Sequence, residues 1–198
     1  MLTRRTFGLG LLTRSARLTS PQADARGTLL PGTDMTVRLA KISMSLSLAA
    51  FALAVTLNNL VDYGTNFLFV RHVLSMDTTF PGNALIGRAI TNPVVWSASY
   101  WQIIAAEGIT GCLLLLGTIS LWRARHAEAS VFNHSKKFVI IGCTLGFLLW
   151  FTGFMVIGGE WFAMWQSKMW NGQDSAFKFY MAILGVLIFI NQPDQDAA

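Results

Sequence analysis

One carboxylate lies inside an otherwise apolar stretch of the chain. Glu107 stands within SYWQIIAAEGITGCLLLLGTISLW, seven residues after Tyr100. A helix rises about 1.5 Å per residue, so Glu107 lies about 10 Å along the helix from Tyr100. A carboxylate inside a bilayer costs about 2.5–3.5 kcal/mol on insertion scales, and such groups turn toward the protein interior and toward polar partners. Glu107 is therefore the first candidate for chemistry with a proton, an ion or a polar ligand.

Further polar residues are expected at a similar depth. Two asparagines and an aspartate end the first apolar stretch, a glutamate ends the third, and two arginines come from the long connection between the first two. We expect them to form one polar cluster with Glu107. The cluster is either a site for a proton, an ion or a small polar ligand, or a buried ion pair that fixes the register of the helices. Its predicted members are Glu107, Asn58, Asn59, Asp62, Glu160, Arg71 and Arg88.

Other kinds of catalytic or cofactor site have little support in the sequence. Cys112 and Cys143 lie in apolar segments and form no CxxC pair. His72, His126 and His134 lie outside the apolar stretches, whereas haem held inside a membrane needs histidines within them. The chain has no GxSxG nucleophile elbow, no phosphate-binding loop and no GxGxxG dinucleotide motif. We therefore expect no cofactor and no metal, and an enzyme is the least supported class.

The composition and four long apolar stretches predict an all-α membrane protein. Of the 198 residues, 53% are hydrophobic and 13% are charged, whereas soluble domains carry about 25% charged residues. The stretch 138–159 has no charged residue and spans about 33 Å as a helix, enough to cross a hydrocarbon core. We predict a transmembrane domain over 35–192 and a polar tail over 193–198. The four predicted spans are 42–60, 98–122, 138–159 and 176–191.

The connection between the first two spans, 63–97, is too apolar for a solvated loop. Its first part, TNFLFVRHVLSM, has the pattern of a short amphipathic helix at the membrane interface. We expect the connection to form a helical cap that folds back over the outer end of the bundle.

Small residues and tryptophans mark two further features around the third span. A GxxxG pair and a glycine one heptad later suggest close helix packing, within the bundle or against another subunit. Tryptophans beyond the span suggest an aromatic belt at the interface, with ligand stacking as the alternative. The glycines are Gly142, Gly146 and Gly153, and the tryptophans are Trp161, Trp165 and Trp170.

Basic residues predict the orientation. Four lie between the second and third spans, and Arg38 and Lys41 precede the first span. The positive-inside rule therefore places both termini in the cytoplasm of a bacterial inner membrane, or in the matrix for a mitochondrial inner membrane. Residues 1–34 are rich in arginine, and we expect them to be disordered. They resemble a twin-arginine export signal or a mitochondrial transit peptide, or translation starts at Met35.

Several separated stretches resemble a known family. They are NNLVDYGTNFLFVRHVLSMDTTFPGNALIGRAI, SYWQIIAAEGITG, FNHSKKF and GFLLWFTGFMVIGGEWFAMWQSKMWNGQ. Over residues 36–194 the chain is similar to the bacterial predicted small integral membrane proteins of domain-of-unknown-function family 2165. The resemblance implies a four-helix inner-membrane protein and carries no established activity. It does not extend to the leader, which favours the start at Met35.

Two function classes follow from these features. The small size, the lack of cofactor ligands in the spans and the glycine and aromatic surfaces favour a non-enzymatic accessory or assembly subunit of a membrane complex. The alternative is a small transporter or ion-conducting or proton-conducting protein that uses the carboxylate cluster around Glu107. The expected partners are the lipid bilayer and, in addition, other membrane subunits or a second copy of the chain. No basic stripe with interleaved aromatic residues is present, so nucleic acid is not indicated.

Overall fold

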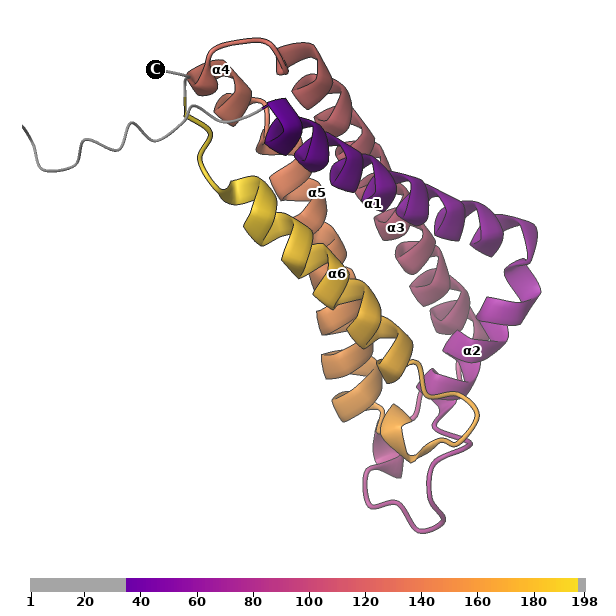
Figure 1. Cartoon of the computed structure of the whole chain (residues 1–198). Helices are drawn as coiled ribbons and strands as arrows, with labels where there is room; N and C mark the ends of the chain where they lie inside the picture. Colours follow the sequence, from indigo (N-terminus) through magenta and orange to yellow (C-terminus); the bar gives the residue numbers. More distant parts are fainter. Residues whose placement is uncertain (1–34, 196–198) are drawn as a thin grey trace, which may run out of the picture. The chain divides into compact units, whose positions relative to one another are not determined.

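The computed structural model describes residues 35–195, which form helices joined by short connections (Figure 1). The predictions for residues 1–34, and for residues 196–198 of the tail, lie outside this part of the chain. No strand occurs between residues 35 and 195, so the all-α prediction is confirmed. In chain order the elements are α1 (Met35–Val61), α2 (Tyr63–Ser75), η1 (Ile86–Arg88), α3 (Pro93–Ala124), α4 (Ala129–His134), α5 (Lys137–Leu148), η2 (Leu149–Trp161), η3 (Met164–Gln166) and α6 (Gln173–Asn191).

The described chain contains four helical segments that are long and apolar enough to cross a membrane, which confirms the predicted number of spans. The third segment, Ala129–Trp161, combines α4, α5 and η2, and the other three are α1, α3 and α6. Helix α3 begins with an N-cap, because the Asn92 side chain accepts a hydrogen bond from the Val94 amide at 2.9 Å and Pro93 follows directly. Its 32 residues extend over about 48 Å, beyond a hydrocarbon core of about 30 Å.

The third span changes its helix type along its length. The predicted span over 138–159 lies within one helical segment, in which α5 ends at Leu148 and a π-helix of 13 residues, η2, follows it. Its end is marked by the hydrogen bond from the Phe162 amide to the carbonyl of Ile157, five residues earlier, at 3.0 Å. Most π-helices are single turns, often at functional sites. The wider turns of η2 set the positions of the side chains that face α3 and α2.

Glycines allow α3 to lie very close to its neighbours. Helix α3 contacts α1 on one side and α5 on the other, and α5 also contacts α6 (Figure 1). A Cβ atom added at Gly111 would lie 2.7 Å from Leu53 of α1. One added at Gly117 would lie 2.6 Å from the backbone nitrogen of Val139 in α5. Neither position has room for a side chain, so the spacing of three helices depends on these two residues.

One end of the bundle, which we call the α2 end, consists of α2, η1 and residues 162–172. Helix α2 buries Val70, Val73 and Leu74 against α3 and against the segment that follows η2. On α3 the buried partners are Tyr100 and Ile104. The hydrophobic contact therefore fixes α2 across the end of α3 instead of leaving it as a free connection.

The opposite end, which we call the α4 end, contains an ion-pair network that the sequence analysis did not predict. Asp194, assigned to a polar tail, has a fully buried side chain. Its carboxylate accepts hydrogen bonds from Lys41 Nζ at 2.7 Å and binds Lys136 Nζ at 2.5 Å. Both lysines also donate to the carbonyl of Gln192. The segment after α6 is thereby fixed to the start of α1 and to the residue before α5.

Burial by itself raises the pKa of the Asp194 carboxyl, but the hydrogen bonds and positive charges of Lys136 and Lys41 outweigh burial and hold the pKa below its usual value. Arg38 completes this end of the bundle. Its guanidinium donates to the carbonyls of Arg125 at 3.0 Å and Ala127 at 2.6 Å, next to the end of α3. A cation at this position also interacts favourably with the helix dipole.

The Asp194 network gives a testable prediction. Changing Asp194→Ala leaves two buried lysines without their carboxylate, and breaking a buried pair in this way costs about 3–5 kcal/mol. We therefore expect a clear fall in the melting temperature, measured in detergent by fluorescence-detected size-exclusion chromatography after heating. Because the pKa of Asp194 is lowered on folding, the stabilisation is present above the ordinary aspartate pKa of about 3.9 and is lost as the pH falls through the lowered value.

The matched control is Asp174→Ala. Asp174 forms an exposed pair with Lys178, one turn along α6. Exposed ion pairs contribute less than about 1 kcal/mol to the free energy of unfolding, so this variant should have the melting temperature of the wild type. Equal melting of both variants would contradict the structural importance of the Asp194 network.

Candidate functional site

Glu107 lies at the centre of a buried set of polar groups between α1, α2 and α3. Its side chain is 3% exposed, and Oε2 accepts a hydrogen bond from Asn59 Nδ2 at 2.7 Å. The Asn59 Oδ1 atom in turn accepts a hydrogen bond from Asn66 Nδ2 of α2 at 2.6 Å. The Tyr100 hydroxyl donates to the Asn59 carbonyl at 3.3 Å. All these partners are neutral, so the carboxyl group is hydrogen-bonded without a cation beside it.

The structure brings Asn59 and Glu107 of the predicted cluster together and places the other members elsewhere. Asn58 and Asp62 are exposed, and Asp62 accepts a hydrogen bond from Thr65 at 3.0 Å. Glu160 is exposed at the end of η2. These carboxylates and the amide therefore lie on the surface, not beside Glu107.

The two arginines of the predicted cluster bind aromatic rings instead of Glu107. The Arg71 guanidinium lies 5.5 Å from the centre of the Trp96 ring. Arg88 lies 4.5 Å from the Trp161 ring and donates to the Trp161 carbonyl at 3.2 Å. Within residues 35–195 no ion pair involves Glu107. The interpretation of this site as a buried ion pair therefore finds no contact that supports it.

A cavity of about 310 Å³ adjoins the Glu107 carboxyl. Its polar lining comes from Glu107 and Asn59, which are buried, and from Asn66, Asn171 and Ser175, which are exposed at the α2 end. The cavity thus connects a buried carboxyl with side chains that are open to the surroundings. Half of the remaining lining residues are aromatic: Phe69, Tyr100, Trp150, Phe154 and Phe179.

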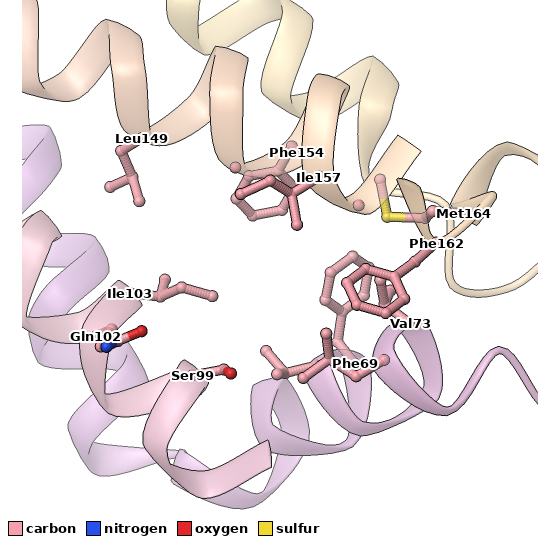
Figure 2. A pocket seen from close by; sticks show the side chains of 14 residues that line it. Phe69, Val73, Ser99, Gln102, Ile103, Leu149, Phe154, Ile157, Phe162 and Met164 are labelled. Carbon is pink, nitrogen blue, oxygen red and sulfur yellow. The ribbon is translucent and has the colours of Figure 1, made fainter. Parts of the chain in front are cut away.

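A second cavity, of about 260 Å³, lies between η2, α2 and α3 and is almost entirely apolar. In Figure 2, Ser99, Gln102 and Ile103 on one helix face Leu149 and Phe154 on η2. Side chains of α2 and of the segment after η2 close one end of this space. The two cavities share four lining residues and are therefore neighbours: Phe69, Val70, Ile103 and Phe154.

The predicted packing glycines have different surroundings. A Cβ atom at Gly142 would lie 2.9 Å from Leu114 of α3, and one at Gly146 would lie 3.1 Å from Ile183 of α6. Both glycines thus lie at helix contacts within the bundle. Gly153 has nothing within 4 Å of an added Cβ and instead lines the apolar cavity.

The three tryptophans of the predicted belt also have specific neighbours. Trp161 is 55% exposed beside Arg88, and Trp165, 48% exposed, contacts Phe80 edge to face at 5.8 Å. Trp170 is only half-exposed and stacks on His72 at 4.6 Å. The belt interpretation stays a prediction.

Several residues of the site were missed by sequence reasoning. Asn66, Asn171 and Ser175 reach the cavity only because α2 and the start of α6 meet at the α2 end. A weak signal was present for Asn66, which is a polar residue directly before the apolar run 67–70. For metals, the described part of the chain holds no group of three or more His, Cys, Asp or Glu side chains that could bind an ion.

Neighbouring asparagines on α1 give a matched test of the hydrogen bond to Glu107. Asn59→Ala removes the donor to a buried carboxyl and the acceptor for Asn66, and an unsatisfied buried polar group costs about 1–3 kcal/mol. We therefore expect a lower melting temperature in detergent. Asn58→Ala changes an exposed residue, and such changes usually stay within about 0.5 kcal/mol. If both variants have the same melting temperature, the hydrogen bond does not hold α1 against α3.

Comparison with known proteins agrees with this architecture. A family model described as "Predicted small integral membrane protein (DUF2165)" matches residues 37–193. Searches of the curated proteins and of the solved structures each found no match. The match covers nearly all of the four apolar helices, with Glu107 and Asn59, and it ends one residue before Asp194. The chain therefore belongs to this family of small integral membrane proteins.

Proposed function

We propose that the protein is a small transporter in which the Glu107 carboxyl binds the transported proton. The observation that carries this proposal is a buried carboxyl with neutral partners at the side of a cavity that extends to exposed residues. A carboxyl buried in this way is stable when it holds a proton or binds a cation. Glu107 can therefore take up and release a proton without breaking an ion pair.

Further polar side chains are buried along α3 between Glu107 and the α4 end. Thr110 follows Glu107 by one turn, and its Oγ1 atom has no hydrogen-bond partner among the residues that the structure describes. Further along the same face of α3, Thr118 shares a hydrogen bond of 2.8 Å with Ser45 of α1. Ser45 lies one turn from Lys41, which belongs to the Asp194 network. Thr110 lies against Gly146 of α5, whereas Ser45 and Thr118 lie between α1 and α3, so the buried polar groups occur at separate levels of the bundle.

The proposed orientation follows from charge. Arg38, Lys41 and Lys136 gather at the α4 end, together with the basic residues of the connection between α3 and α5. The positive-inside rule favours this end in the cytoplasm of a bacterial inner membrane, with both termini on that side. The cavity beside Glu107 then takes up protons from the outer side.

Proteoliposomes test the transport proposal. Purified protein is reconstituted with the pH-sensitive dye pyranine inside, and a potassium gradient with valinomycin sets an inside-negative potential. We expect the lumen to acidify faster than in protein-free liposomes. Glu107→Gln keeps the size of the side chain and an oxygen for the Asn59 hydrogen bond but removes the titrating group, so acidification should fall to the protein-free rate.

Asp62→Asn is the control, because it neutralises an exposed carboxylate that contacts Thr65 and not the cavity. This variant should acidify the lumen at the wild-type rate. Wild-type protein that is no faster than bare liposomes, or a Glu107→Gln variant as fast as the wild type, would overturn the proposal.

The accessory-subunit function is the second candidate, and one surface feature favours it. An open apolar groove is lined by residues of α1 and α3, some of them small. Small residues allow a helix of another subunit to approach closely in a membrane. The small lining residues are Ala105, Gly108 and Cys112.

Purification in mild detergent at native expression level, followed by mass spectrometry, tests this second candidate. A stoichiometric membrane partner is expected, and it should be lost when Gly108→Leu fills the groove. Gly185→Leu is the control, because Gly185 lies on α6 with nothing within 4 Å of an added Cβ atom. Recovery of the protein without any stoichiometric partner would contradict the accessory function.

A further inference from the structure

We propose that the two neighbouring cavities together bind an organic ammonium ion that carries an apolar group. The cation would lie beside Glu107 and the apolar group between η2, α2 and α3. This inference rests on the proposed function, since the ammonium ion exchanges with the proton on the same carboxyl. It names organic ammonium ions as the chemical class of a second substrate, in addition to the proton.

The Glu107 cavity has the composition that an organic cation requires. One buried carboxyl supplies a counter-charge, and no lysine or arginine of the described chain competes for it. Aromatic rings supply much of the remaining wall, and cations are attracted to the faces of such rings. Trp150 and Phe179 lie 5.8 Å apart, and Phe69 and Phe154 lie 6.0 Å apart. An alkylated ammonium ion fits this lining better than a bare metal ion, which needs several oxygen ligands.

The apolar cavity has the size for a ring or a short alkyl chain. An enclosed apolar cavity of about 150 Å³ takes up benzene in another protein. The cavity here measures about 260 Å³ and is partly open, since Gln102 and Ile157 in its lining are exposed. Ser99 and Gln102 are the polar side chains in its lining, and both come from the start of α3 (Figure 2). An apolar substituent therefore gains burial in this cavity, whereas a second charge would have no partner there.

Shared walls place the two cavities within reach of one small molecule. Phe69, Ile103 and Phe154 belong to both linings, so only side chains separate the carboxyl cavity from the apolar one. Gly172 makes this wall possible, because a Cβ atom there would lie 2.9 Å from the Phe69 ring. A small ligand that carries its charge next to its apolar group matches two cavities that share walls.

Equilibrium dialysis with the full chain in nanodiscs of zwitterionic lipid tests the inference. The probe is radiolabelled benzyltrimethylammonium, and tetramethylammonium is the matched cation without the ring. We expect the ring to strengthen binding at least about tenfold, as burial of a phenyl group in an apolar cavity predicts. Glu107→Gln should abolish binding of both ions. Ser99→Phe, which fills the apolar cavity without touching the Glu107 cavity, should remove the preference for the ring and leave tetramethylammonium binding unchanged.

The outcomes separate this inference from the function on which it rests. If the ring adds no affinity, or if Ser99→Phe leaves the preference intact, the apolar cavity is not a binding site and the inference fails. If neither ion binds while Glu107→Gln still stops proton flux, the inference fails and the transport proposal stands. If both ions bind the Glu107→Gln variant as tightly as the wild type, the carboxyl is not the cation site. A Ser99→Phe variant that melts with the wild type confirms that lost ring preference is not a folding defect.

Discussion

Burial of the Glu107 carboxyl in an apolar environment is the constraint on which the arrangement of the α2 end depends. A carboxyl removed from water requires hydrogen-bonding partners, and Asn59 of α1 supplies the direct one. Asn59 is held in turn by Asn66 of α2 and by the Tyr100 hydroxyl. Three helices are thus connected through one asparagine. The same requirement that holds these helices together leaves a polar wall at the edge of a cavity, so stability and a binding surface come from one set of groups.

The two ends of the bundle stabilise their buried carboxyl groups in different ways. At the α4 end, Asp194 is paired with Lys41 and Lys136, and both lysines also donate to the carbonyl of Gln192 within a closed contact. At the α2 end, Glu107 has hydrogen bonds but no counter-ion, and space remains beside it. The first arrangement suits a permanent structural contact. The second suits a group that changes its charge state or its ligand.

Much of the fold could be predicted from the sequence, because an apolar stretch long enough to cross a bilayer folds there as a helix. The inward position of Glu107 also followed from the cost of exposing it to lipid. The positions of Arg71 and Arg88 could not be predicted by pairing opposite charges. Their guanidinium groups lie against the nearby rings of Trp96 and Trp161 instead. Asp194 was assigned to a tail, because its partners are 153 and 58 positions away in the chain. The change from α5 to a π-helix has no recognised sequence signal, and it shapes the apolar cavity.

The position of Asp194 also has a consequence for the order in which the protein assembles. Arg38 and Lys41 enter the membrane with the first helix, and Lys136 follows with the third, while Asp194 is synthesised after all four. Until α6 has been inserted, the cations at the α4 end lack their carboxylate. The early helices therefore keep their positive charges in contact with water and lipid headgroups on one side of the membrane, where they help to fix topology. The Asp194 contacts that close the α4 end therefore require that α6 has been synthesised.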